Sequence, residues 1–466
     1  MNRDYNREMF SFIEKSPSCF HVIQNLRERL DAEGFEALEE NEDWSVRRGI
    51  RNGGKYYVVR NDSSLIAFQI PDGQAKGFHM AASHSDSPSF KIKEHPETEV
   101  EGHYVRLNTE KYGGMILSTW LDRPLSVAGR VAVKENGRIV TKLVNIDRDL
   151  LVIPNLAIHM NRDMNKGVEY NPQVDMLPLY ADCACGEGGS DGQSVVPGGH
   201  GGVQGMLIGE IAETVGVNAE EILGHDLFLY VRDKCRVLGQ EGAFVLAPRL
   251  DDLQCVFASM EAFLASSPQE YISLCAVFDN EEVGSGTKQG ADSTFLEDVI
   301  ARVCEELCPE KDEDVAQGGI ARQDRILHQS SLTLMRRMLA DSFLISADNA
   351  HAVHPNHPEK ADPTNRPYLN GGIVIKYHGS QKYTTDALSA AKMKDLCIRA
   401  GVPFQTYANR SDMVGGSTLG NISTAHVSVS SVDIGLPQLA MHSAVETAGS
   451  RDTEYAVRAL QAFFGE

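Results

Sequence analysis

The stretch from Cys275 to Ser285 reads Cys-Ala-Val-Phe-Asp-Asn-Glu-Glu-Val-Gly-Ser and passes abruptly from apolar to acidic residues. Its apolar part is typical of a buried strand, which ends in two adjacent carboxylates, Glu281 and Glu282. Adjacent residues that leave a strand point in different directions, so one glutamate could bind a metal ion while its neighbour acts as a base on a water molecule. Because most such pairs are solvated surface charge, the pair becomes informative only together with other signals.

The composition is that of a globular protein with a strong acidic excess. At 466 residues the chain is long enough for two domains or one elaborated domain. Its formal net charge of −21 argues against a surface that binds nucleic acid or an anionic membrane. The same charge would repel an acidic ligand unless the binding site carries a local cation.

Cysteine usage and the N-terminal residues bear on the cellular compartment. The nine cysteines, an odd number, follow no regular framework, which predicts free thiols in a reducing compartment. Residues 1–8 contain no apolar core of signal-peptide length, and no stretch of the sequence reaches the length of a membrane span. We therefore expect a cytoplasmic protein without membrane or nucleic-acid partners.

The first hundred residues predict helices followed by strands. Helical periodicity continues up to Gly34, which is a typical residue for a helix end. Two runs, 55–60 and 64–70, then flank a turn in the manner of a hairpin. A short apolar strand over 78–83 follows, and it delivers His84 at its end.

The middle of the chain differs from the flanking parts in its sequence pattern. From about 94 to 237 the sequence has short β-like runs and many turns, and its glycine-rich tract 186–202 predicts a mobile loop. After Pro248 the alternation of helix and strand resumes and continues to the C-terminus. We therefore predict one α/β domain from residues 1–93 and 238–466, with 94–237 as a mainly β insertion.

Metal-binding residue types follow several other apolar runs. Open α/β sheets place their sites at the carboxyl edge of the sheet, so these side chains are expected to meet there. They are His84 and Asp86, Asp251 at the expected start of a helix, Asp348 with His351 and His354 nearby, and His442. Each alone has an ordinary explanation, because single histidines are usually hydrogen-bonded groups and single aspartates are usually helix caps. Together with the glutamate pair they form a complete ligand set for a two-metal hydrolytic site.

The ordered series of these motifs resembles the aspartyl aminopeptidase family of co-catalytic zinc exopeptidases. The motifs are Ser83–Pro88, Arg249–Asp252, Asp279–Ser285, Ala347–Asn356 and Met441–Ser443, and the ligand-free segments Ile153–Met160, Gly371–Lys376 and Ser411–Thr418 also match. The resemblance covers essentially the whole chain. It departs from the family pattern at Asn155, where some members have histidine, and at Ile373, where proline is common; neither position is a ligand.

The resemblance implies a fold and a metal centre. The fold would be α/β, with a mixed-sheet zinc-exopeptidase catalytic domain and an inserted, mainly β dimerisation domain. Two Zn²⁺ ions per subunit are expected, although cobalt and manganese suit the same ligands. His84, a bridging Asp251 and Asp348 would hold one ion, and Asp251, Glu282 and His442 the other. Glu281 matches the general acid/base, and Asp86 matches the carboxylate that orients His84.

The resemblance also implies a substrate and an assembly. The expected reaction is removal of N-terminal aspartate or glutamate from peptides by a homododecamer. Lys376 is the expected pocket cation, with a solvated lysine at a strand end as the alternative, and His351 could help to shape the pocket. His159 matches a histidine that enters a neighbouring subunit's active site.

Two other functions stay open at this point. A two-metal aminopeptidase or deacylase of other specificity would use the same ligands, so only substrate preference distinguishes it from an aspartyl aminopeptidase. A non-catalytic assembly or cargo-binding homologue would be expected to lack a ligand or the base, whereas all six candidates are present.

Overall fold

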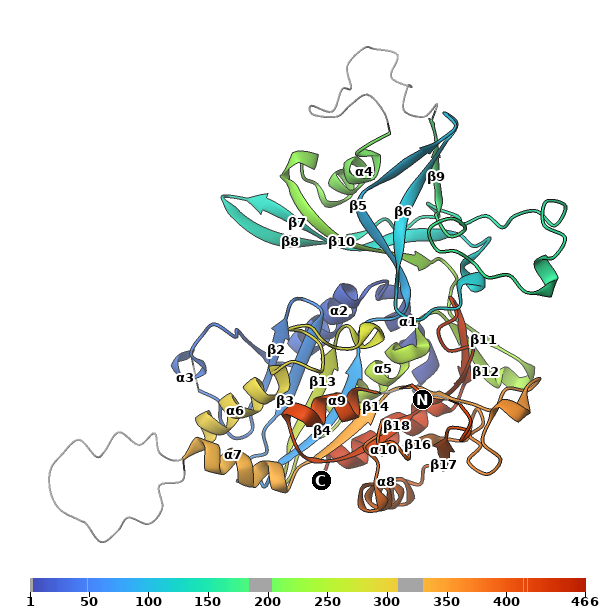
Figure 1. Cartoon of the computed structure of the whole chain (residues 1–466). Helices are drawn as coiled ribbons and strands as arrows, with labels where there is room; N and C mark the ends of the chain where they lie inside the picture. The colour runs from blue at the N-terminus through green and yellow to red at the C-terminus, as the bar shows by residue number, and fades with distance from the viewer. Residues whose placement is uncertain (1–2, 48, 184–202, 309–329, 414, 417) are drawn as a thin grey trace, which may run out of the picture.

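The structure is a computed structural model that describes residues 3–47, 49–183, 203–308, 330–413, 415–416 and 418–466. Within these residues, nine strands form the main sheet seen in the lower half of Figure 1. In spatial order they are β1 (Glu36–Leu38), β2 (Lys55–Arg60), β3 (Ser64–Gln69), β13 (Ile272–Phe278), β4 (Phe78–His84), β14 (Phe343–Ala347), β18 (Ser430–Gly435), β16 (Ile373–Tyr377) and β17 (Phe404–Ala408).

The main sheet is mixed. Its central strands β13, β4, β14 and β18 are mutually parallel, whereas β2, β3 and β16 each run antiparallel to a neighbour. All residues of β4, β13 and β14 are buried, as expected for parallel strands that are covered on both faces. The predicted mixed α/β fold is therefore confirmed.

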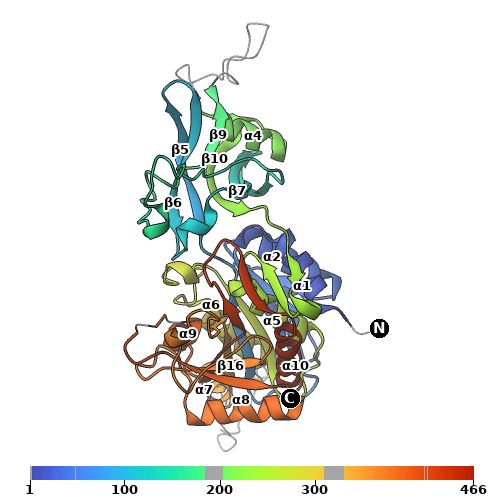
Figure 2. The same ribbon diagram turned by 90° about the vertical axis from the view of Figure 1, so that its right-hand side faces the viewer.

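Helices cover both faces of this sheet, as Figure 2 shows from the side. One face packs on α1 (Tyr5–Lys15), α2 (Cys19–Ala32), α5 (Leu250–Leu264), α8 (Ala387–Ala400) and α10 (Asp452–Phe464). The other face packs on α3 (Trp44–Arg47), α6 (Phe295–Leu307), α7 (Ser331–Ala340) and α9 (Leu419–His426). Alternate residues of β4 serve the two cores: Ala81 belongs to the first, and Met80 and Ala82 belong to the second.

A second sheet lies apart from the main sheet, at the top of Figure 1. In spatial order its antiparallel strands are β8 (Arg138–Asn145), β7 (Leu125–Glu135), β10 (Ile222–Val231), β5 (Ser89–Val100), β6 (Tyr104–Tyr112) and β9 (Leu179–Asp182). With α4 (Met206–Val215) it encloses a hydrophobic core of its own. Its strands run from Ser89 to Val231, whereas the predicted insertion spans residues 94–237.

A small third sheet connects the C-terminal part of the chain to the start of α5. Its strands are β11 (Arg236–Leu238), β12 (Phe244–Ala247), β20 (Glu446–Gly449), β19 (Pro437–Leu439) and β15 (Ala350–His351). Short 3₁₀ helices complete the described elements: η1 (Leu117–Trp120), η2 (Met164–Lys166), η4 (Ala219–Glu221), η5 (Gln240–Gly242), η6 (Glu281–Val283) and η8 (Pro358–Lys360).

The local predictions for the first hundred residues are confirmed. The hairpin strands are β2 and β3, and the predicted strand is β4, which ends at His84. Gly34 follows the end of α2 with a φ of 79°, a conformation that favours glycine. The glycine-rich tract 186–202 lies outside the described residues. None of the helices in the described part of the chain is long and apolar enough to cross a membrane.

Candidate metal centre

Three neighbouring strands deliver acidic and imidazole side chains to one edge of the main sheet. His84 is the last residue of β4, and it pairs in register with Phe278 at the end of β13. Because β4, β13 and β14 are parallel, the residues that follow them meet at the same carboxyl edge. Asp348 follows β14 directly, and Glu281 and Glu282 form the short helix η6 after β13.

Two further segments reach this edge from outside the parallel strands. Asp251 and Asp252 lie in the first turn of α5, where a cis peptide bond joins them and their backbone angles are not helical. Their neighbours Leu250 and Leu253 are fully buried in the core, which anchors the turn. His442 lies between β19 and β20 with a φ of 65°, a left-handed conformation that is uncommon for a residue with a side chain.

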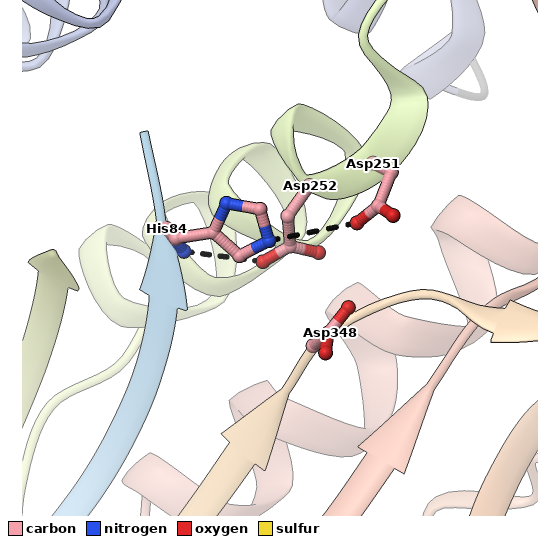
Figure 3. Close-up of side chains that lie close together, drawn as sticks. All are labelled: His84, Asp251, Asp252 and Asp348. Carbon is pink, nitrogen blue, oxygen red and sulfur yellow. Dashed lines mark hydrogen bonds and ion pairs between the residues drawn. The ribbon is translucent and has the colours of Figure 1, made fainter. Parts of the chain in front are cut away.

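The Asp251 carboxylate lies between two histidine rings. Its Oδ1 is 3.5 Å from His84 Nε2, and its Oδ2 is 3.4 Å from His442 Nε2. A dashed line in Figure 3 marks the contact between His84 and Asp251. His442 Nε2 is also 3.4 Å from Glu282 Oε1. Two ligand atoms on one tetrahedral zinc ion are about 3.3–3.5 Å apart, given zinc–ligand bonds of about 2.0–2.1 Å. These pairs therefore have the separation of atoms that share an ion.

The side chains form three overlapping groups in which the ligand atoms lie within 4.8 Å of one another. The first contains His84, Asp251, Asp252 and Asp348, the second Asp251, Glu282 and His442, and the third His84, Glu281 and Glu282. Figure 3 shows the Asp348 carboxylate at the end of its strand, facing the first group.

Several oxygens of these groups have no hydrogen-bond partner. Among the described residues, the buried atoms Asp251 Oδ1, Asp252 Oδ1 and Glu282 Oε1 accept no hydrogen bond. Buried carboxylate oxygens without a donor are costly unless a cation meets them. The donor set of imidazole and carboxylate, together with these oxygens that accept no hydrogen bond, fits a divalent metal ion.

Asp86 fills the place expected of an orienting carboxylate. His84 Nδ1 lies 3.1 Å from the Asp86 carbonyl oxygen and 3.4 Å from Asp86 Oδ1. The Asp86 carboxylate also accepts the backbone N–H groups of Glu281, at 3.1 Å, and of Glu282, at 3.2 Å. The same side chain therefore faces one histidine and holds the turn that carries both glutamates. An imidazole that donates from Nδ1 presents Nε2 as the free ligand atom.

Crowding of carboxyl groups shifts the proton equilibria of the site. Burial raises the pKa of the Glu281 carboxyl to about 8, and the negative charge of Asp348 adds to this effect. Burial also raises the pKa of Asp348 to about 6, although the charge of Lys376 opposes the rise. For Glu282, burial and the charge of Asp251 raise the pKa well above its ordinary value. Without cations the site therefore retains protons, which cations would displace.

The two histidines have the opposite effect on Asp251. Burial alone would raise its pKa, but His442 and His84 face its two oxygens and hold the pKa well below the usual range. Burial lowers the pKa of His442, yet Asp251 and Glu282 outweigh burial and raise it to about 10. The raised pKa favours the protonated ring of His442, whose Nε2 faces two carboxylates at a position suited to a cation.

Lys376 contacts the first group of side chains and His351 lies in the third sheet, whereas His159 belongs to neither. Lys376 is 3% exposed near the end of β16, and its Nζ is 3.5 Å from Asp348 Oδ2. Its side chain is therefore not a solvated surface lysine. His351 ends β15, and its ring centroid is 6.2 Å from that of Tyr407. His159 is exposed in a turn that follows Ile153, outside the cluster of metal-ligand side chains.

The structure adds polar residues that the sequence analysis missed. Asp252 Oδ2 accepts the backbone N–H of His84 at 3.2 Å. Glu446 is 2% exposed and accepts the backbone N–H groups of Asp251, at 3.0 Å, and of His442, at 2.7 Å. The adjacent aspartates are visible in the sequence, but their different roles are not. Glu446 offers only its spacing of four residues from His442 as a signal.

Comparison with known proteins gives a consistent result over the whole chain. The sequence model of the family described as aminopeptidase I zinc metalloprotease (M18) matches residues 12–464. A probable M18 family aminopeptidase 2 of Clostridium novyi is 43% identical over 464 residues, which cover 99% of this chain and 98% of the relative. The protein of the same name in Pseudomonas aeruginosa is 38% identical over 467 residues, which cover 100% of this chain and 99% of the relative.

Solved structures of similar proteins share the fold. The cryo-EM structure of the Ape4 and Nbr1 complex contains a chain that is 34% identical, with a TM-score of 0.89 over 99% of this chain and 85% of that chain. The yeast mApe1 dodecamer contains a chain that is 27% identical, with a TM-score of 0.80 over 99% of this chain and 96% of that chain.

Proposed function

The chain belongs to the M18 family of zinc metalloaminopeptidases, and we propose that it removes N-terminal aspartate or glutamate from peptides with a dinuclear metal centre. The observation that carries the dinuclear centre is the Asp251 carboxylate, which faces His84 with one oxygen and His442 with the other. A carboxylate in this position can bridge two ions. We assign His84, Asp251 and Asp348 to one ion, and Asp251, Glu282 and His442 to the other.

The residues around the proposed centre have separate roles in peptide hydrolysis. Two divalent cations in the site would polarise the scissile carbonyl and allow a water molecule to react near neutral pH. Glu281 accepts a proton from the attacking water at its carboxylate and then donates it to the leaving amine. Its backbone N–H donates to Asp86, which supports a fixed position over the ligands. The remaining negative charge of the site attracts a free α-amino group and so restricts cleavage to the chain end.

Acidic specificity requires a local cation in this strongly acidic protein. Lys376 supports this assignment because it is buried and its Nζ lies 3.5 Å from Asp348 Oδ2, beside the proposed metal site. Burial lowers its pKa, but the negative charges around it, with Asp348 the largest contributor, together outweigh burial, so the raised pKa keeps the ammonium group charged at neutral pH. We propose that it binds the carboxylate of the substrate side chain, with His351 on an adjacent wall.

We further propose that the protein assembles into a homododecamer, as the yeast mApe1 protein does. The second sheet would form the dimer contact. Around His159, the apolar side chains of Leu156, Ile158 and Met160 are all exposed, with Met160 75% accessible. A partner subunit would cover these side chains and would bring His159 near its own metal centre.

Matched peptides that begin with Asp, Glu, Leu or Lys test the proposed reaction. We expect rapid release of only the acidic residues, loss of activity with a chelator and recovery when Zn²⁺, Co²⁺ or Mn²⁺ is added back. An N-acetylated copy of the Asp peptide should resist cleavage. Preference for Leu or Lys would favour a two-metal aminopeptidase of other specificity, and cleavage of the acetyl group would favour a deacylase. No turnover with any metal would favour the non-catalytic homologue.

A further inference from the structure

The β5–β6 ribbon of the second sheet begins and ends at the metal centre. Strand β5 starts at Ser89, three residues after Asp86, and β6 returns to end at Tyr112. Ser89 and Tyr112 are paired across the ribbon. Because a slip of one residue would turn Tyr112 to the opposite face, this register determines which side chain approaches Asp86.

Tyr112 makes a direct contact with the orienting carboxylate. Its hydroxyl donates to Asp86 Oδ2 at 2.7 Å and accepts a hydrogen bond from Asn280 Nδ2 at 2.8 Å. Asp86 in turn faces His84 Nδ1 and accepts the N–H groups of the glutamate turn. The hydrogen bond from Tyr112 to Asp86, and the contacts of Asp86 with His84 Nδ1, thus connect the second sheet to His84.

The residues after Tyr112 contact the other histidine. The Gly114 carbonyl oxygen accepts a hydrogen bond from His442 Nδ1 at 2.6 Å, and the Ile116 N–H donates to the His442 carbonyl at 3.0 Å. This arrangement leaves His442 Nε2 facing the proposed ion. Gly113, with a φ of 78°, lies so close to the turn that a Cβ atom there would be 3.1 Å from Glu282 Cβ.

We infer that the segment Tyr112–Ile116, which leaves the second sheet at the end of β6, completes the outer hydrogen bonds of both proposed metal sites, with Tyr112 as a positioning residue that acts through Asp86. The inference rests on the proposed dinuclear centre. It assigns the second sheet a role in metal binding that is separate from any role in assembly. Loss of an outer hydrogen-bond partner typically weakens metal binding or activity by about 10–100-fold.

The variant Tyr112→Phe tests this role because it removes only the hydroxyl. The ring can keep its edge contact with Phe228, whose centroid is 5.4 Å away. Tyr180→Phe is the matched control: Tyr180 lies in β9 of the same sheet, and its hydroxyl donates to the Glu210 carboxylate of α4 at 2.9 Å, outside the groups of candidate metal ligands. Both variants lose one hydrogen bond from a tyrosine to a carboxylate, and Tyr112→Phe also loses the hydrogen bond from Asn280.

The experiment compares full-length wild type and both variants after removal of metal. Titration with Co²⁺ against a competing chelator gives the affinity of each binding step, and the visible spectrum of bound Co²⁺ reports ligand geometry. We expect Tyr112→Phe to weaken Co²⁺ binding by about 10–100-fold, with the larger loss in one step, and to change the spectrum. Tyr180→Phe should match wild type. Thermal unfolding of the metal-free proteins checks that the variants are folded.

The outcomes separate this inference from the proposed function. Wild type that binds two Co²⁺ ions and cleaves peptides, with a Tyr112→Phe variant identical to it in affinity and spectrum, would overturn the inference and leave the proposed function intact. An equal loss of Co²⁺ affinity in Tyr112→Phe and Tyr180→Phe would also overturn the inference, because a general destabilisation of the second sheet would then explain both results. Wild type that binds no Co²⁺ would overturn the proposed centre and the inference together.

Discussion

The two oxygens of the Asp251 carboxylate face different histidines, with Oδ1 3.5 Å from His84 Nε2 and Oδ2 3.4 Å from His442 Nε2. A residue in this position affects both proposed ions at once. No other side chain of the described ligand groups contacts both histidines in this way. Substitution of Asp251 should therefore have a larger effect on metal binding than substitution of a ligand to one ion.

The variant Asp251→Asn should lose both ions. The amide keeps the size of the side chain but removes the charge that the two cations would share. We expect metal binding to weaken by more than the 10–100-fold that is typical of outer partners. Elemental analysis after dialysis measures the metal content, and Asp348→Asn is the matched comparison, which should keep one ion more strongly than the other. Full metal content in Asp251→Asn would contradict the bridging assignment.

The variant Glu281→Gln should retain metal and lose turnover. The amide cannot accept a proton from water, and a positioned acid/base typically contributes about 10²–10⁴-fold to the rate. We expect kcat to fall by about this factor while the metal content stays near that of wild type. Glu282→Gln provides the contrast, since the adjacent glutamate should affect metal content first. A Glu281→Gln variant that loses its metal would instead identify this residue as a ligand.

The variant Lys376→Met should change specificity. Methionine is apolar and suits a buried position, but it cannot pair with a carboxylate. A hydrogen bond to a charged group contributes about 1.5–3 kcal/mol, so kcat/KM for Asp- and Glu-peptides should fall by about 10–100-fold, with little change for a Leu-peptide. Because Lys376 also pairs with Asp348, metal content must be measured in parallel. An equal loss on all peptides would assign the lysine to the metal centre rather than to the pocket.

Removal of metal should make the stability of the protein depend on pH. Burial raises the pKa of Glu281 and of Glu446 to about 8. A carboxyl whose folded pKa exceeds its unfolded value of about 4.3 favours the folded state at low pH, and that contribution is lost as the pH rises through about 8. His442, whose pKa is raised to about 10, changes stability in the same direction. Its contribution to the stability of the fold is present below about pH 6.5 and is lost as the pH approaches 10.

We therefore expect the unfolding midpoint of chelator-treated protein to fall between pH 5 and pH 9. The metal-loaded protein should show a smaller fall, because bound cations compensate the ionised carboxylates. Denaturant unfolding at three pH values, with and without metal, measures both effects. A metal-free protein that becomes more stable as the pH rises over this range would contradict the argument.

Many features of the catalytic edge are readable from the sequence because they depend on local patterns. His84, Asp348 and the glutamate pair each follow an apolar run, and a strand that ends in a polar ligand is recognisable without knowledge of its neighbours. The hairpin and the first helices are predicted for the same reason. Helical periodicity and turn-forming residues are signals that extend over only a few neighbouring positions in the sequence.

Other features depend on which segments meet in space. The order β13-β4-β14 brings together residues that are far apart in the chain, and no local pattern states that order. The packing of α5 against this edge gives Asp251 and Asp252 different roles. Asp251 faces two histidines, whereas Asp252 accepts the backbone N–H of His84. The packed fold also buries Lys376 beside Asp348, where the sequence alone allowed a solvated lysine.

The candidate metal ligands are thus proposed from the amino-acid sequence, because residue type and strand ends are local properties. The partners that orient those ligands do not follow from it. Tyr112 and Glu446 contact the centre only because strand register and sheet packing bring them there across long stretches of chain. Hydrogen bonds between distant segments depend on the packed fold, and the packed fold is what completes the site.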